Sequence, residues 1–153
     1  MVLYNTRFCD QGLPELVKEQ TLDTPVERIT CADQIYQVCT GALGLQFHTE
    51  EYLYVIAINS YGDILGCFEV SHGTVNASVS SPREIFLKLL LLGAVAFFMA
   101  HNHPSQHSKP SQEDISVTKR IKEVGDILGI QLLEHIIVGK DSYTALFRDE
   151  YMC

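Results

Sequence analysis

The stretch AVAFFMAHNHPSQHSKPSQEDI, residues 94–115, decides the fold, because the most apolar part of the chain passes there directly into imidazoles and carboxylates. Residues 94–100 are apolar throughout, over a length that is typical of a buried strand. Residues 100–114 then hold three of the six histidines, two prolines and an acidic pair. A rigid strand that ends in such side chains suggests a site built at the edge of a sheet.

His101 and His103 are two positions apart and directly follow the predicted strand. Side chains two residues apart in an extended chain project to the same side, and Pro104 favours extended backbone at His103. Two imidazoles that project together form half of a tetrahedral zinc site. The alternative is an exposed loop in which both histidines face water, and the pair alone does not decide between the two.

Residues 112–129 predict a helix after this loop. Its apolar face combines five positions, Ile115, Thr118, Ile121, Val124 and Leu128. Asp114 lies in the first turn, in register with Val117, Thr118 and Ile121, so it should point toward the two histidines and offer a third ligand. The alternative is helix capping, with Ser111 as the N-cap and Asp114 as its capping-box partner. Capping does not exclude a role for Asp114 as a ligand.

The rest of the chain alternates between patterns of strands and helices. Residues 1–25 suggest an extended arm or a short hairpin, and residues 30–44 a helix that Thr30 caps and Gly44 ends. The other predicted elements are a strand at 51–59, one long or two shorter strands at 64–79 bent near Gly73, a helix from Pro82 to Gly93 with Ser81 as its cap, and strands at 130–139 and 142–147. This order predicts a mixed α/β domain with a central sheet flanked by helices, at residues 29–153, after an N-terminal arm of residues 1–28.

Composition limits the class of protein. With 153 residues the chain is long enough for one domain with a core. A net charge of −8 without basic clusters argues against nucleic-acid binding by the isolated chain. Five cysteines without a C-x-x-C pair favour free thiols in a reducing compartment. No signal-peptide pattern and no uninterrupted membrane-length apolar run is present, so we expect a cytoplasmic protein without membrane contact.

The segments HNHPS (101–105) and PSQED (110–114) resemble the JAMM, or MPN-plus, metalloprotease signature, in which His-x-His-Pro precedes Ser-x-x-Asp. Together with GTVNASVSSPREIF (73–86) and EHIIVG (134–139), they make residues 45–148 similar to the RadC family of bacterial JAMM-like proteins. The resemblance implies a single MPN/JAB-type domain of cytidine-deaminase-like architecture. It also implies a Zn²⁺ ion held by His101, His103 and Asp114, with water in the fourth position.

The resemblance also implies two catalytic residues. JAMM enzymes use a glutamate at the start of the first core strand, which falls on Glu51 in EYLYVIAIN (51–59). Glu50 is adjacent, and Glu69 is a further alternative. Such a carboxylate can take a proton from zinc-activated water and deliver it to the leaving amine. Ser111 would donate a hydrogen bond to the oxyanion, a contact typically worth about 3 kcal/mol.

Two positions differ from the common sequence pattern of the RadC family. Gln106 stands where glycine is usual, which leaves the shape of the loop open, and Glu134 stands where aspartate is more common. Neither change removes a ligand. His135 lies in an apolar strand, where a hydrogen-bonded core histidine is favoured over direct metal ligation. Asn102, between the two histidines, is expected to brace the turn.

The leading hypothesis is a zinc-dependent hydrolase of the JAMM type that acts on a peptide or isopeptide bond in a peptide or protein substrate of unknown identity. The alternatives are a non-catalytic metal-binding module and a DNA-repair-associated accessory role, the latter suggested by the family name alone. Larger RadC-like proteins carry an N-terminal helix-hairpin-helix module associated with DNA. Too few residues precede Thr30 to hold such a module, so we do not expect a DNA-binding role here. The sequence does not reveal the oligomeric state.

Overall fold

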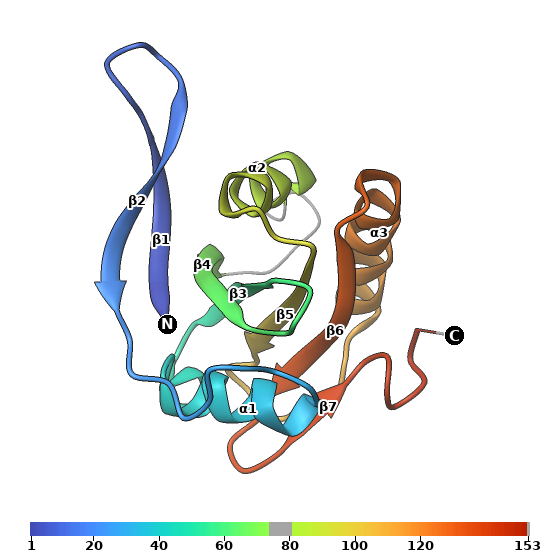
Figure 1. Ribbon diagram of the computed structural model, residues 1–153. Helices are drawn as coiled ribbons and strands as arrows, with labels where there is room; N and C mark the ends of the chain where they lie inside the picture. Colours follow the sequence, from blue (N-terminus) through green and yellow to red (C-terminus); the bar gives the residue numbers. More distant parts are fainter. Residues whose placement is uncertain (74–80, 153) are drawn as a thin grey trace.

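A computed structural model describes residues 1–73 and 81–152, and Figure 1 shows their arrangement. The elements in chain order are β1 (Val2–Phe8), β2 (Pro14–Thr21), α1 (Ala32–Gly41), the 3₁₀ turn η1 (Leu45–Phe47), β3 (Glu51–Ile58), β4 (Ile64–Gly73), α2 (Pro82–Leu92), β5 (Ala96–Asn102), α3 (Gln112–Leu128), β6 (Gln131–Val138) and β7 (Tyr143–Ala145). The seven strands form one sheet in the order β2-β1-β4-β3-β5-β6-β7. Two neighbouring pairs, β1–β4 and β5–β6, are parallel, and the others are antiparallel. The mixed α/β class predicted from the sequence is confirmed.

Helices cover both faces of the central strands, with α1 on one side and α2 and α3 on the other (Figure 1). Successive residues of β3 alternate between two cores, because side chains along a strand point to opposite faces. Tyr54 and Ile56 pack in the core that includes α1, whereas Leu53 and Val55 pack against α2 and α3. Because helices cover both faces of the sheet, the central strands are apolar at nearly every position.

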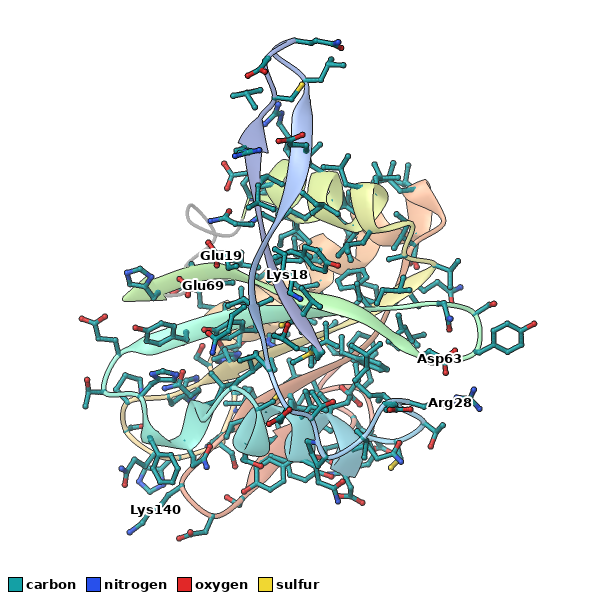
Figure 2. All side chains as sticks on the ribbon, turned by 60° about the vertical axis from the view of Figure 1, so that its left-hand side comes forward. Lys18, Glu19, Arg28, Asp63, Glu69 and Lys140 are labelled. Atoms are coloured by element: carbon teal, nitrogen blue, oxygen red, sulfur yellow. The ribbon has the colours of Figure 1, made fainter. Side chains whose placement is uncertain are left out.

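The first 21 residues form a hairpin, which was one of the two predicted alternatives. β1 and β2 pair along their length, and β1 joins the sheet where Leu3 lies beside Cys67 of β4. The segment that follows is tied to the β3–β4 turn, since Arg28 Nε lies 2.9 Å from Asp63 Oδ1 (Figure 2). The hairpin therefore continues the sheet at its β4 edge.

The β3–β4 hairpin and strands β5, β6 and β7 are confirmed, with small shifts at their ends. β5 extends to Asn102, so His101 lies inside the strand rather than after it. The part of the predicted 64–79 segment beyond Gly73 lies outside the described residues. For α2, Ser81 and Pro82 at the start and Gly93 at the end are confirmed, although the Ser81 side chain makes no capping hydrogen bond.

Some predicted helix details are wrong. Cys31, not Thr30, is the N-cap of α1, because the amide and hydroxyl of Thr30 are both hydrogen-bonded to Gln34 Oε1. The same helix ends before Ala42, and Gly44 is instead the N-cap of η1. Leu128 is 46% exposed and does not belong to the buried face of α3, since the helix ends there. In residues 1–73 and 81–152, no helix has the length and apolarity that a membrane crossing requires.

Candidate metal centre

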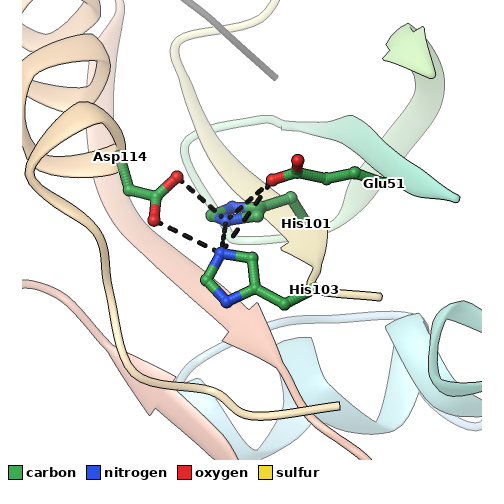
Figure 3. Close-up of side chains that lie close together, drawn as sticks. All are labelled: Glu51, His101, His103 and Asp114. Carbon is green, nitrogen blue, oxygen red and sulfur yellow. Dashed lines mark hydrogen bonds and ion pairs between the residues drawn. The ribbon is translucent and has the colours of Figure 1, made fainter. Parts of the chain in front are cut away.

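Four side chains that the sequence singled out lie together at one end of the sheet, namely Glu51, His101, His103 and Asp114 (Figure 3). They come from the start of β3, the end of β5, the loop after β5 and the first turn of α3. One ligand atom from each lies within 4.8 Å of those from the others. The register of β3 on β5, in which Leu53 pairs with His101, brings the start of β3 to the histidines.

Three of these residues form a tight triangle. His101 Nε2 lies 3.0 Å from His103 Nε2 and 3.2 Å from Asp114 Oδ1, and His103 Nε2 lies 3.3 Å from Asp114 Oδ2. A tetrahedral zinc ion with bonds of about 2.0–2.1 Å places its ligand atoms about 3.3 Å apart. The donor atoms and their spacing therefore fit a metal ion. Glu51 Oε1 lies farther away, at 3.7 Å from His101 Nε2 and 3.9 Å from His103 Nε2.

A capping box at the start of α3 orients Asp114. Its amide donates to Ser111 Oγ over 3.1 Å, and its Oδ2 accepts from the Ser111 amide and hydroxyl, each over 2.7 Å. The carboxylate nevertheless faces both imidazoles, so capping and a ligand position coexist. Burial by itself would raise the pKa of Asp114, but hydrogen bonds with His101, His103 and Ser111 outweigh it and hold the pKa well below its ordinary value. Asp114 is therefore an anion.

The loop after β5 fixes the ring of His103. Its Nδ1 donates to the backbone oxygen of His107 over 2.9 Å, since a carbonyl can only accept, and this leaves Nε2 directed at the triangle. The hydrogen bond with Asp114 raises the pKa of His103 above its ordinary value, although burial opposes the shift. Gln106 has a φ of 61°, and its amide donates to the His103 carbonyl over 2.8 Å. The loop thus adopts, with glutamine, the left-handed conformation that glycine favours.

His135 lies outside the four-residue cluster and contacts it from behind. It is 1% exposed, its Nε2 lies 2.8 Å from His101 Nδ1, and its Nδ1 lies 2.6 Å from Thr118 Oγ1. Burial, with the nearby His101, lowers the pKa of His135 well below its ordinary value. A hydrogen-bonded core histidine was the favoured interpretation. Sequence reasoning placed Thr118 only on an apolar face; the signal it overlooked was that a buried hydroxyl needs a partner.

Asn102 joins two strands and does not brace its own turn. Its Oδ1 accepts from the Tyr52 amide over 2.9 Å, and its Nδ2 donates to the Glu50 carbonyl over 2.9 Å. These bonds flank Glu51 on both sides and fix where β3 begins. Glu50 contributes its backbone, and the side chain of Glu69 lies 2.6 Å from His72 Nδ1, away from the cluster. Among the three glutamates considered, Glu51 is the one in the cluster.

Glu134, which stands where RadC-like sequences more commonly have aspartate, binds the chain segment after β7. Its side chain accepts hydrogen bonds from the amides of His135, Phe147 and Arg148 over 2.8–3.1 Å. It holds the turn that follows β7 against β6 and makes no part of the four-residue cluster. The substitution therefore leaves the candidate site intact.

Comparisons with known proteins agree with this architecture. Residues 29–152 match the family model described as RadC-like JAB domain. A UPF0758 protein of Clostridium novyi (strain NT) is 42% identical over 102 residues, which are 67% of this chain and 45% of that protein. A UPF0758 protein of Clostridium botulinum (strain Alaska E43 / Type E3) is 40% identical over 119 residues, 78% of this chain and 51% of that protein. One of Geotalea uraniireducens (strain Rf4) is 36% identical over 118 residues, 77% and 51% respectively.

This chain spans about half the length of the curated relatives it matches. The names of these relatives state no activity.

Proposed function

This chain belongs to the family of RadC-like JAB domains, and from that premise we propose that it is a zinc-dependent hydrolase of the JAMM type that cleaves a peptide or isopeptide bond. One observation carries the proposal. His101 Nε2, His103 Nε2 and the Asp114 carboxylate lie 3.0–3.3 Å from one another, and the carboxylate of a fourth residue, Glu51, lies farther away at the same site.

The choice of zinc rests on the donor atoms. Two imidazole nitrogens and one carboxylate oxygen are typical of catalytic zinc, which keeps a fourth position for substrate or water. Magnesium and calcium prefer oxygen ligands, so they fit this set less well. Zinc, when bound, would act as a Lewis acid that polarises the amide carbonyl and activates water.

The separation of Glu51 from the triangle suits a proton carrier. Its carboxylate lies 3.7–3.9 Å from the two Nε2 atoms and is 17% exposed, so a water molecule or a substrate amide can reach it. Glu51 would accept the proton of the attacking water and deliver it to the leaving amine. Its backbone pairs with Gly73 of β4, and Asn102 holds the residues on either side, which keeps the carboxylate in place.

Ser111 is the candidate donor to the oxyanion. Its hydroxyl donates to Asp114 Oδ2 over 2.7 Å. To act as an oxyanion donor, the hydroxyl would exchange this hydrogen bond for one to the substrate. The Ser111 amide, which also donates to Asp114 Oδ2, would keep the carboxylate oriented meanwhile.

We further propose that the protein works in a reducing, cytoplasmic environment. Cys9, Cys31, Cys39 and Cys67, the four cysteines within the described residues, are all free thiols, which supports a reducing compartment.

The test combines zinc analysis with digestion of a peptide library by three variants. Glu51→Gln should keep one zinc per chain and lose about 10²–10⁴-fold in rate, because it retains the shape and lacks the proton acceptor. Asp114→Ala should lose most of the zinc. Glu69→Gln, on the neighbouring strand, is the matched control and should behave as the parent protein does.

Two results would contradict the proposal. Folded protein that cannot be loaded with zinc would end it, and equal cleavage by the parent protein and Glu51→Gln would trace the activity to a contaminant. Stoichiometric zinc without cleavage of any peptide would favour the alternative of a non-catalytic metal-binding module.

A further inference from the structure

A chain of hydrogen bonds leads from the back of His101 into the core. His101 Nδ1 lies 2.8 Å from His135 Nε2, and His135 Nδ1 lies 2.6 Å from Thr118 Oγ1. The Thr118 hydroxyl in turn lies 2.5 Å from the backbone oxygen of Asp114. All three side chains are buried. The chain therefore starts at one candidate ligand and ends on the backbone of another.

The direction of each hydrogen bond in this series follows from the number of protons that each group can donate. The Asp114 carbonyl can only accept, so it takes the single proton of the Thr118 hydroxyl. Thr118 Oγ1 must then accept from His135 Nδ1. His135 is 1% exposed and its two ring nitrogens contact Thr118 and His101, neither of which is acidic, so the buried ring is neutral and carries its one proton on Nδ1. His135 Nε2 is consequently an acceptor, and His101 Nδ1 must be the donor to it. This leaves a lone pair on His101 Nε2, the atom that faces the other ligands.

We propose that Thr118 and His135 are positioning residues that fix the tautomer and the ring orientation of His101, so that its Nε2 is ready to bind the metal. The inference rests on the metal site of the proposed function. His103 needs no such chain, because one carbonyl, that of His107, sets its tautomer directly. Helix α3 thus serves the site twice, through the carboxylate of Asp114 and through the backbone oxygen of the same residue.

The opposite direction would block the site. If the Thr118 hydroxyl donated to His135 Nδ1, His135 Nε2 would carry the proton and donate to His101 Nδ1. A neutral His101 would then hold its proton on Nε2, where it excludes a metal. This arrangement would also leave Thr118 Oγ1 and the Asp114 carbonyl oxygen 2.5 Å apart with no proton between them, and it differs from the first in the protonated nitrogen of His135. Partners of this kind around a ligating histidine typically change metal affinity 10–100-fold when they are lost.

The first test reads the nitrogen chemical shifts of the histidine rings in the zinc-loaded parent protein. We expect His135 to be protonated on Nδ1 and unprotonated on Nε2. A proton on His135 Nε2 would overturn the proposal. Because this measurement needs no substitution, it decides the question even where a variant fails to fold.

The second test compares zinc dissociation constants, measured by competition with a chromophoric chelator. Thr118→Val keeps the shape and lacks the hydroxyl, and His135→Leu removes the acceptor, so each should weaken zinc binding 10–100-fold. Thr118→Ser restores the hydroxyl, and His135→Gln places an oxygen near the former Nε2. Both should bind zinc within a few-fold of the parent protein.

The control is Ile121→Val, which shortens a buried side chain on the same face of α3 without touching the hydrogen bonds. It should leave zinc affinity unchanged. Equal affinity of Thr118→Val and Thr118→Ser would refute the positioning role while the metal site stands. Failure of the parent protein to bind zinc would instead refute the proposed function.

Discussion

Replacement of Gln106 by glycine should stabilise the protein by about 1 kcal/mol. Gln106 has a φ of 61°, and the left-handed region costs an L-residue roughly 1–2 kcal/mol. Glycine avoids this strain but loses about 0.5–1 kcal/mol more conformational entropy on folding. The side chain of Gln106 is exposed, and the loop is held by its backbone, which donates to His103 and accepts from Lys140. Relief of strain therefore outweighs the entropy loss by a small margin.

The assay is thermal unfolding by calorimetry in the presence of a chelator, with Gln106→Ala as the matched control. For a chain of this length, 1 kcal/mol corresponds to a rise in Tm of about 3 °C. The alanine variant keeps the strain and should show no gain. Zinc affinity should be equal in all three proteins, because the backbone contact to His103 is retained. A glycine variant less stable than the alanine variant would refute the reasoning.

Three further outcomes are expected. Gly125→Ala would place its Cβ 2.5 Å from the backbone oxygen of Ile130, so urea denaturation should show a loss of about 2–3 kcal/mol; parent-like stability would mean that the end of α3 shifts freely. Ser111→Ala should lose about 1 kcal/mol of stability and 10²–10³-fold in hydrolysis rate with zinc retained. Loss of zinc in that variant would mean that Ser111 orients Asp114 as a ligand and would argue against a role as oxyanion donor. Calorimetric zinc titration should show that affinity falls as the pH is lowered, and the fall should begin above the ordinary pKa of histidine, about 6.5. The hydrogen bond with Asp114 raises the pKa of His103, so protons compete with the metal for this ring at a higher pH than for an ordinary histidine; constant affinity would contradict this.

The local part of the candidate site could be predicted from the sequence. His101, His103 and Asp114 lie within fourteen positions, and their directions follow from the period of a strand and of a helix. The capping box was predictable for the same reason. Glu51 is different, because its position depends on the pairing of Leu53 with His101 across two strands. Periodicity does not determine such a register, so the family resemblance supplied this residue.

Contacts between side chains explain what sequence reasoning missed. Thr30 looked like a helix cap, yet the Gln34 side chain satisfies its amide and hydroxyl. Thr118 and His135 looked like separate core residues, and their contact becomes visible only when α3 packs on β6. Local propensity describes each residue with its neighbours along the chain. It does not describe hydrogen bonds to side chains that belong to other helices or strands.

His101 and His103 are attached to the protein in different ways, and this has a consequence for metal exchange. The backbone of His101 is paired on both sides, with Leu53 and with Ile137, whereas His103 lies one residue beyond the end of β5. An incoming ion thus meets one anchored imidazole and one carried by a loop. The rate of metal loading would then depend on the loop that carries His103 more than on β5, which holds His101 in place.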